Sequence, residues 1–371
     1  MKRSIRALVL LFVLSSALTM CAKEKQYRMY AVGFYNLENL FDTCHDEGKR
    51  DYDFLPTGSY RWNGLKYSHK LRNMARVLSE MGTDRLPKGC AFIGVSEVEN
   101  AKALTDLCAQ EPLAQRNMRF VHFEGVDKRG VDCALLYNPS LFTVDTVRTR
   151  LYPYVDADTT FYTRGFLAVH GRLADEDVCV IVTHLPSRLR PGDEKRVSGA
   201  EQITAIIADI RKQSPDTKFF VMGDMNDDPT DRSMCEGLRG KENIDDVGAT
   251  DLYNPWISVI KSGKGTLRYD GQWNLFDQIL MSQNLLNRKK TNDFSTLKYF
   301  RHQIFSRDYL FQTEGKYKGN PKRTHAGGQW RDGYSDHLPV VVYTVKEVKC
   351  PSAARQPHTG SKREAVSLCR A

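Results

Sequence analysis

Polar residues that can bind a metal ion or transfer a proton recur at the ends of apolar runs in this chain. In chain order they are Asn36, Glu38, Glu97, Glu99, His184, Asp224, Asn226, Asp336 and His337. Taken singly, each could form a turn or cap a helix, since Asp and Asn commonly do so after a strand. Their repetition in this position instead indicates a site for metal binding or acid-base chemistry that is assembled from several strands.

Strands and helices that could position these residues alternate along the first two thirds of the chain. Short apolar runs rich in β-branched residues predict buried strands at 29–34, 90–95, 131–137, 178–183, 218–222, 276–281 and 340–343. Apolar residues in steps of three and four predict helices over 71–81 and 200–210. This alternation predicts a layered α/β domain, in which strand ends meet at one edge and bring distant side chains together.

The two ends of the chain differ from its body. Residues 1–21 combine three basic residues, an apolar run and small residues, which is typical of a secretory signal sequence and too short to span a membrane comfortably. Cys21 closes this segment in a setting similar to a bacterial lipobox, so both lipid attachment and simple cleavage stay open. We expect one domain over 22–349 and a disordered tail over 350–371.

Charge, cysteine spacing and missing periodicity narrow the classes of protein to consider. The formal net charge is +9, but residues 1–21 and 350–371 each contribute +3, which favours a mixed-sign surface on the body over a large basic face. The cysteines show no CxxC pair or metal-finger spacing, so we expect most of them to be buried small residues. The stretches 43–62 and 287–332 lack a sustained period and are expected to be surface insertions.

Five short segments resemble, in order, the signature of the endonuclease/exonuclease/phosphatase superfamily. They are YNLEN at 35–39, GVSEV at 94–98, THL at 183–185, GDMN at 223–226 and SDHLPV at 335–340. The resemblance runs from about Met29 to Tyr343. It implies an α/β four-layer sandwich of two central mixed β-sheets flanked by helices, as in deoxyribonuclease I, and metal-dependent hydrolysis of a phosphate ester.

The resemblance also implies a cation and an activated water. Glu97 would be the principal metal ligand, and Asn36 and Asp336 would complete the set. Hard oxygen ligands suit Mg²⁺, for which one or two carboxylates suffice, and Mn²⁺ would fit the same oxygens. Asp224 would orient or deprotonate the attacking water, and Asn226 would hold a phosphate oxygen.

Two imidazoles and an arginine complete the site that the resemblance implies. His337 would meet the scissile phosphate, with Asp277 fixing its tautomer and raising its pKa. His184 would hydrogen-bond to a phosphate oxygen from the other side, with Asp132 as its supporting partner, and Arg164 would grip the substrate phosphate. The alternatives for Asp132 and Arg164 are an exposed strand-edge charge and a surface arginine.

Three functions are compatible with this predicted site. The first is an exported endonuclease or phosphodiesterase acting on DNA or RNA, and the second is a sphingomyelinase-like or inositol-phosphate phosphoesterase. The third is a non-catalytic binding protein with the same fold. The aromatic segment 299–311 could meet a membrane in the second case or stack on bases in the first. A monomer is the state that the family implies.

Overall fold

The computed structural model describes residues 25–161, 163–189 and 192–348. The chain divides into a small unit, 1–27 with 347–371, and a main unit, Arg28–Lys346. The predicted signal sequence, Cys21 and the predicted tail lie outside the described residues. In the part of the chain that is described, none of the helices has the length and apolar character needed to cross a membrane.

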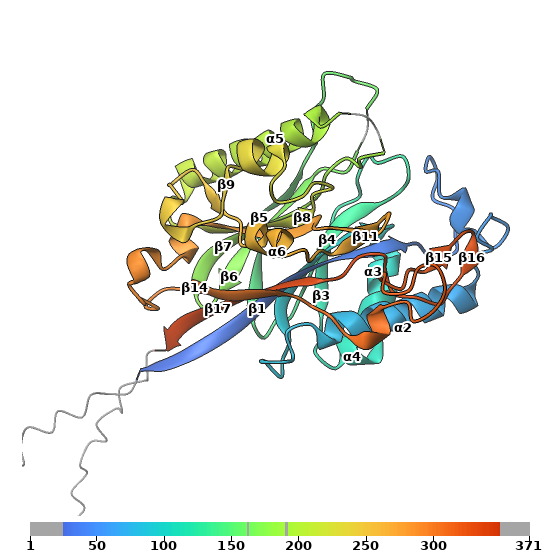
Figure 1. Ribbon diagram of the computed structural model, residues 1–371, viewed down its shortest axis with the longest axis horizontal. Helices are drawn as coiled ribbons and strands as arrows, with labels where there is room; N and C mark the ends of the chain where they lie inside the picture. The colour runs from blue at the N-terminus through green and yellow to red at the C-terminus, as the bar shows by residue number, and fades with distance from the viewer. Residues whose placement is uncertain (1–24, 162, 190–191, 349–371) are drawn as a thin grey trace, which may run out of the picture. The chain divides into compact units, whose positions relative to one another are not determined.

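Two mixed β-sheets form the centre of the main unit (Figure 1). The first has the order β14 (Lys298–Ile304), β17 (Val340–Val348), β1 (Gln26–Leu40), β2 (Cys90–Val98), β4 (Asp132–Tyr137) and β3 (Arg119–His122). The second has the order β5 (Phe142–Tyr152), β6 (Phe166–Leu173), β7 (Glu176–His184), β8 (Lys218–Asp224), β13 (Asp277–Ser282), β10 (Leu252–Tyr253) and β9 (Gly240–Lys241). Two hairpins stand apart, β11 (Leu267–Tyr269) with β12 (Gln272–Asn274) and β15 (His325–Ala326) with β16 (Gln329–Trp330).

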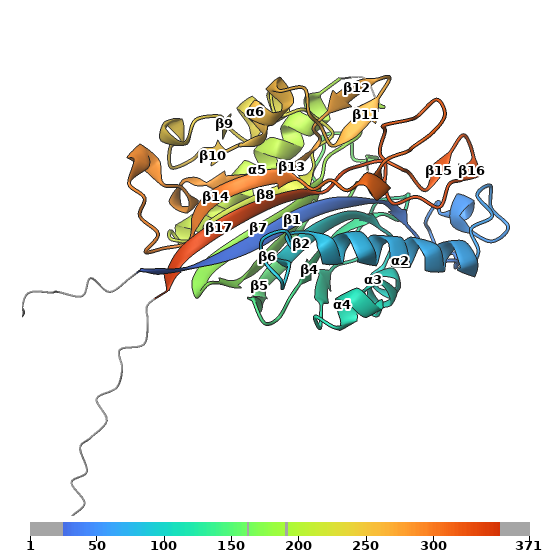
Figure 2. The ribbon, with the colours of Figure 1, turned by 60° about the horizontal axis from the view of Figure 1, so that its bottom comes forward.

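Helices cover the outer face of each sheet (Figure 2). The first sheet is covered by α2 (Gly64–Glu80), α3 (Ala101–Cys108) and α4 (Glu111–Ala114), and the second by α5 (Glu194–Gln213). The side chains of Asn63 and Asn100 cap α2 and α3 by accepting backbone N–H groups of the first turn. The remaining helical segments are α6 (Trp256–Lys261), a π-helical turn at Ser233–Gly237, and 3-10 turns at Tyr52–Phe54, Ile244–Asp246, Gln283–Leu285, Arg288–Lys290 and Asp308–Leu310.

Three apolar cores hold these layers together. Between the sheets, Phe92 of β2 packs edge-on against Phe220 of β8, with ring centroids 5.7 Å apart. Gly94 permits this close approach, because a Cβ there would lie 2.7 Å from the sulfur of Met222. Apolar residues of α2, such as Leu78, form the second core against the first sheet, and those of α5 form the third against the second sheet. The predicted four-layer α/β sandwich is therefore confirmed.

All seven predicted strands are present, and the predicted helices correspond to α2 and α5. The prediction for 287–332 was wrong in part, because β14 pairs with β17 at the edge of the first sheet. Interleaved charged residues, which are common on edge strands, conceal β14 in the sequence. The strands β5 and β6 were not predicted, and β5 is an edge strand with mostly half-buried or exposed side chains.

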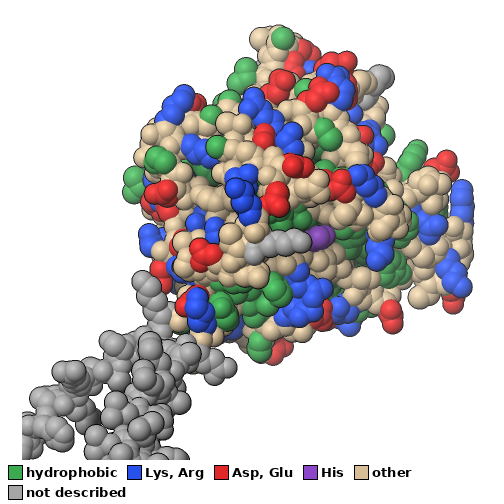
Figure 3. All heavy atoms as spheres, turned by 60° about the vertical axis from the view of Figure 1, so that its left-hand side comes forward, with side chains coloured by type: hydrophobic (Ala, Val, Ile, Leu, Met, Phe, Trp, Pro, Cys, Tyr) green, Lys and Arg blue, Asp and Glu red, His purple; other side chains and the backbone are tan. Residues whose placement is uncertain are grey.

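Charges of both signs lie on one face of the protein (Figure 3). On the face shown in Figure 3, Lys and Arg side chains are interspersed with Asp and Glu side chains. Among the described residues, oppositely charged side chains form close pairs, such as Lys195 with Asp156 at 2.7 Å. Charge alone therefore does not mark a nucleic acid-binding face on this side of the molecule.

Candidate active site

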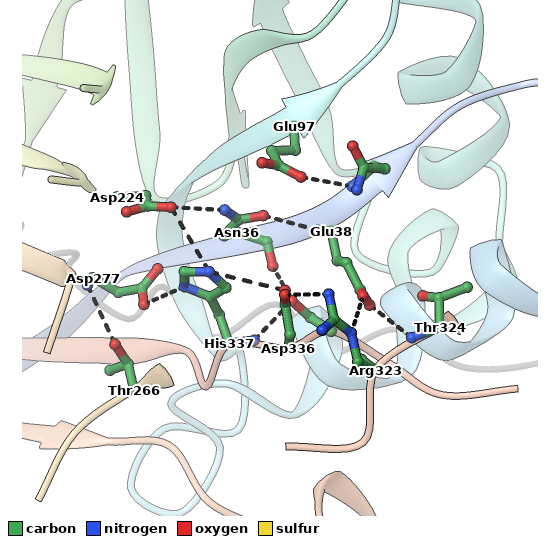
Figure 4. A network of polar contacts seen from close by, with 12 residues as sticks. Asn36, Glu38, Glu97, Asp224, Thr266, Asp277, Arg323, Thr324, Asp336 and His337 are labelled. Carbon is green, nitrogen blue, oxygen red and sulfur yellow. Dashed lines mark hydrogen bonds and ion pairs between the residues drawn. The ribbon is translucent and has the colours of Figure 1, made fainter. Parts of the chain in front are cut away.

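Several of the predicted polar residues, among them Asn36, Asp224 and His337, lie close together where the two sheets meet (Figure 4). The strands β1 and β2 are parallel in the first sheet, and β7 and β8 are parallel in the second, so each pair ends together. In the second sheet His184 pairs with Asp224, and Asp224 pairs with Asp277 at the start of β13. Asn36 bridges the two sheets, because its Nδ2 donates to Asp224 Oδ2 at 2.9 Å.

Asp224 is the centre of this network and is almost fully buried. Its Oδ1 accepts the backbone N–H of Asn226 at 2.9 Å. Two imidazoles face its other oxygen, since His184 Nε2 lies 3.5 Å and His337 Nε2 lies 3.8 Å from Asp224 Oδ2. Burial raises the pKa of Asp224 to about 6, against the opposing effect of His337. At neutral pH Asp224 is therefore an ionised carboxylate that can accept a proton from water.

His337 and Asp277 form a buried pair, as predicted. Nδ1 of His337 lies 2.7 Å from Oδ2 of Asp277. The pair is held from both sides, because the backbone N–H of Asp277 donates to Thr266 Oγ1 and that of His337 donates to Ser335 Oγ. Burial disfavours the charged imidazole, but the carboxylates of Asp277 and Asp224 outweigh it and raise the pKa of His337 well above its usual value. His337 is therefore a cation that can donate a proton.

His184 lies beside Asp224 but lacks the partner predicted for it. Asp132 Oδ2 instead lies 3.1 Å from Nε2 of His122 and accepts the backbone N–H of Gly125 at 3.0 Å. Nδ1 of His184 is buried and has no hydrogen-bond partner within the described ranges. Burial lowers the pKa of His184 well below its usual value, so its imidazole is neutral. The predicted support by Asp132 was wrong, because β3 and the loop after it occupy that carboxylate.

Glu97 lies in a bulge of β2, at a backbone position that few residues adopt. The pairing of β2 with β4 skips Glu97, and its φ of 58° is unusual for a residue with a Cβ. Oε2 of Glu97 accepts the backbone N–H of Asn39 at 3.0 Å, while Oε1 lies 3.6 Å from Nη2 of Arg129. The bulge therefore fixes this carboxylate and leaves Oε1 without a close hydrogen-bond donor in the described part of the chain.

Asn36, Glu97 and Asp336 offer oxygen ligands of the kind that Mg²⁺ prefers. The side chain of Asp336 is 25% exposed, so an ion and its waters can reach it. A separate group of three possible ligands, His122, Glu124 and Asp132, has its ligand atoms within 4.8 Å of one another among the described residues. Two carboxylates and an amide suit an ion that keeps several of its waters, as Mg²⁺ does.

Sequence analysis missed a charged cluster beside Asp336. Arg323 donates from Nη2 to Asp336 Oδ2 at 2.8 Å and from Nε to Glu38 Oε1 at 3.1 Å. Lys70 of α2 lies 4.0 Å from Glu38 Oε2 and donates to Thr324 Oγ1 at 2.7 Å. Burial raises the pKa of Glu38 to about 7 and lowers that of Lys70 to about 8. Of Glu38, Lys70 and Arg323, only Glu38 stood out in the sequence, because it follows the first apolar run.

Arg164 is buried and hydrogen-bonded to the end of β7. Its side chain is 7% exposed, and its Nε and Nη2 donate to the backbone carbonyls of His184 and Leu185 at 3.0 and 3.3 Å. Its Nη1 donates to Asp127 Oδ2 at 3.0 Å. Arg164 therefore fixes the end of β7. Asn226 also donates from Nδ2 to Leu185 O, at 2.9 Å, and the phosphate contacts expected of Arg164 and Asn226 stay predictions.

Comparison with known proteins agrees with this architecture. Residues 31–346 match the model described as the endonuclease/exonuclease/phosphatase family, whereas no curated protein matches the chain. The solved structure of ANGEL2, a 2′,3′-cyclic phosphatase, is similar with a TM-score of 0.56 and 13% identity, over 89% of this chain and 100% of that one.

Two structures from Bacteroides thetaiotaomicron are similar as well. An endonuclease/exonuclease/phosphatase family protein has a TM-score of 0.52 and 16% identity, over 87% of this chain and 97% of that one. A mannosyl-6-phosphatase from strain VPI-5482 has a TM-score of 0.51 and 15% identity, over 85% of this chain and 99% of that one. At these identities the likeness concerns the fold alone.

Proposed function

Because this chain belongs to the endonuclease/exonuclease/phosphatase family, we propose that it is a divalent-metal-dependent phosphoesterase, most specifically an exported endonuclease or phosphodiesterase acting on nucleic acid. The observation that carries the proposal is the convergence of Asp224, His184 and the His337–Asp277 pair at one edge of the two sheets. Two of the similar structures are described as a 2′,3′-cyclic phosphatase and a mannosyl-6-phosphatase. The fold thus serves several phosphate esters, and the substrate needs a direct test.

The geometry divides proton transfer between a base and an acid. Asp224 accepts a proton from the attacking water, since it is ionised at neutral pH and held by Asn36. His337, kept protonated by Asp277, donates to a phosphate oxygen or to the leaving oxygen. His184 is neutral, so it contributes a hydrogen bond rather than a full charge.

Asn36, Glu97 and Asp336 would hold the cation, and we propose Mg²⁺, with Mn²⁺ able to use the same oxygens. A bound cation supplies positive charge at the non-bridging oxygens of the phosphate. The backbone N–H of Asn39 helps to hold the Glu97 carboxylate in place.

The structure removes one argument for the sphingomyelinase-like alternative. The aromatic segment 299–311 could have supplied an apolar surface for a membrane, but Phe305 and Leu310 are buried in the core that α2 covers. Phe300 is the large apolar side chain of this segment that is well exposed. The non-catalytic alternative is disfavoured, because every expected acid-base position is filled and His337 is paired with Asp277.

Purified protein tests these functions directly. It is incubated with plasmid DNA, RNA, sphingomyelin and inositol phosphates, each with Mg²⁺ and with EDTA. We expect cleavage of nucleic acid with Mg²⁺, loss of cleavage in EDTA, and recovery with Mg²⁺ or Mn²⁺. Turnover that survives EDTA would contradict the metal requirement. Turnover of a lipid or inositol phosphate alone would favour the sphingomyelinase-like or inositol-phosphate phosphoesterase. No turnover at all would favour the non-catalytic binding protein.

We also propose that the protein is exported and monomeric, and that Cys21 is either lipidated or removed with the signal sequence. Cell fractionation and the mass of the mature N-terminus distinguish the two fates of Cys21. With lipidation, Cys21→Ser moves the protein out of the membrane fraction. With simple cleavage, Cys21→Ser leaves the distribution of the protein between membrane and soluble fractions unchanged. Light scattering of the mature protein tests the monomer.

A further inference from the structure

Arg323 differs from Arg164 in that its guanidinium is both fixed at the site and accessible. Its side chain is 51% exposed, against 7% for Arg164. An arginine carries five N–H groups in a planar fork, and Arg323 gives one to Glu38 and one to Asp336. Its third nitrogen, Nη1, has no hydrogen-bond partner in the described part of the chain. The guanidinium can therefore donate to a further anion that approaches from the solvent.

The segment that carries Arg323 is tied to the body of the protein. The backbone N–H of Tyr334 donates to the carbonyl of Lys322 at 2.6 Å, which closes the segment into a loop. Lys70 of α2 then donates to both sides of this loop, to Thr324 Oγ1 at 2.7 Å and to Tyr334 O at 2.5 Å. Arg323 is thus held in place before any ligand binds. This reduces the conformational entropy that its side chain loses on binding.

Charges of both signs lie next to Arg323. Glu38 is buried, accepts the backbone N–H of Thr324 at 2.7 Å, and lies 4.0 Å from Nζ of Lys70. Two cations, Lys70 and Arg323, therefore lie beside two carboxylates, those of Glu38 and Asp336. Asp336 brings this cluster to the catalytic centre, because it directly precedes His337 in the chain and accepts from Arg323 (Figure 4).

We propose that Arg323 binds a non-bridging oxygen of the substrate phosphate and holds the phosphate product. A planar guanidinium is well suited to such a contact. The contact would come from a segment outside the five family-like motifs. The identity of the anion rests on the proposed function, whereas the existence of an anion site at Arg323 does not.

Binding of inorganic phosphate tests the proposal without turnover. Isothermal titration calorimetry in Mg²⁺ compares the wild-type protein with Arg323→Gln, Arg323→Lys and Arg331→Gln. Arg331 is an exposed arginine of the same segment, so it is the matched control. We expect Arg323→Gln to weaken phosphate binding by about 10-fold or more, since a hydrogen bond to a charged group is lost. The phosphate affinity of Arg323→Lys should lie between those of the wild type and Arg323→Gln, and the affinity of Arg331→Gln should match the wild type.

A purely structural role gives a different result. Thermal melting then shows a destabilised Arg323→Gln protein whose folded fraction binds phosphate as tightly as Arg331→Gln, and this overturns the proposal. Absence of phosphate binding to the wild-type protein at millimolar concentrations overturns it as well. If the wild type binds phosphate through Arg323 yet hydrolyses no ester, the proposed function fails and the anion site stands.

Discussion

Asn36 Nδ2 donates to Asp224 Oδ2 at 2.9 Å across the junction of the two sheets. Asn36 belongs to β1 of the first sheet, and Asp224 ends β8 of the second. Ser335 Oγ donates to the carbonyl of Asn36 at 2.7 Å, which ties the turn before β17 to the same point. The acid-base groups and the candidate cation ligands are therefore positioned by the packing of one sheet on the other.

Replacing Asn36 by Ala should shift the acidic limb of the pH profile to higher pH. The hydrogen bond from Asn36 lowers the pKa of Asp224, which burial holds at about 6, so its loss raises that pKa further. We expect a shift of up to about one pH unit, measured as kcat/KM against pH at saturating Mg²⁺. An acidic limb that stays in place would show that Asp224 is not the titrating base.

Replacing Asp277 by Asn should shift the basic limb of the pH profile to lower pH. Asp277 helps to raise the pKa of His337, so the neutral amide lets that pKa fall, and the protonated acid is lost at lower pH. We expect the basic limb to move to lower pH and kcat to drop by about 10²–10⁴-fold. Asp209→Asn, at an exposed carboxylate of α5, is the control and should behave as wild type. Normal kcat in Asp277→Asn would remove the pair from the mechanism.

Replacing Glu97 by Gln should weaken the binding of the cation. The amide keeps the shape of the side chain but removes its charge, so we expect Mg²⁺ or Mn²⁺ affinity to fall by about 10–100-fold. Calorimetric titration with Mn²⁺ measures this without substrate. Glu124→Gln is the matched control, because Glu124 belongs to the separate group with His122 and Asp132. Should Glu124→Gln lose the ion and Glu97→Gln keep it, the cation site has been placed wrongly.

Replacing Lys70 by Met should destabilise the protein strongly. Lys70 is a buried cation 4.0 Å from Glu38 Oε2, and its loss leaves that carboxylate poorly compensated. We expect the free energy of unfolding to fall by about 3 kcal/mol in urea titrations. The double variant Lys70→Met, Glu38→Gln should recover part of this loss. A Lys70→Met protein within about 0.5 kcal/mol of wild type would show that the pair is not coupled.

Lowering the pH should destabilise the fold through His302. Burial lowers the pKa of His302 to about 4, below its usual 6.5, so the folded state binds fewer protons than the unfolded chain. The stabilising contribution is present above pH 6.5 and is lost as the pH falls toward 4. We expect His302 to account for about 1–2 kcal/mol of lost stability between pH 7 and 5. His302→Asn should flatten the urea-derived stability curve, and an unchanged slope would contradict the assignment.

The fold and most of the site could be predicted because polar residues at strand ends share an edge in a layered domain. The buried strands have unbroken apolar runs, and the parallel pairs β1–β2 and β7–β8 put Asn36, Glu97, His184 and Asp224 at that edge. The pairing of His337 with Asp277 was predictable only through the family resemblance, since the two residues lie 60 positions apart.

The rest depends on loop conformation, which carries no periodic signal. The choice of Asp132 as the partner of His184 failed because the β3–β4 hairpin places His122 opposite that carboxylate. Arg323 lies 285 residues from Glu38, in a stretch without hydrophobic period, and Lys70 is a lysine on the buried face of α2. Charged residues buried by long loops leave no trace in the pattern of the sequence.

The neighbourhood of β17 and β1 has a consequence for a shortened chain. These strands lie side by side in the first sheet, although one opens the described chain and the other closes it. His337 and Asp336 immediately precede β17, so they reach the other catalytic groups only once the last strand has docked on the first. A polypeptide that lacks β17 would therefore lack the strand that places His337 beside Asp224, and the proposed hydrolysis would require that strand.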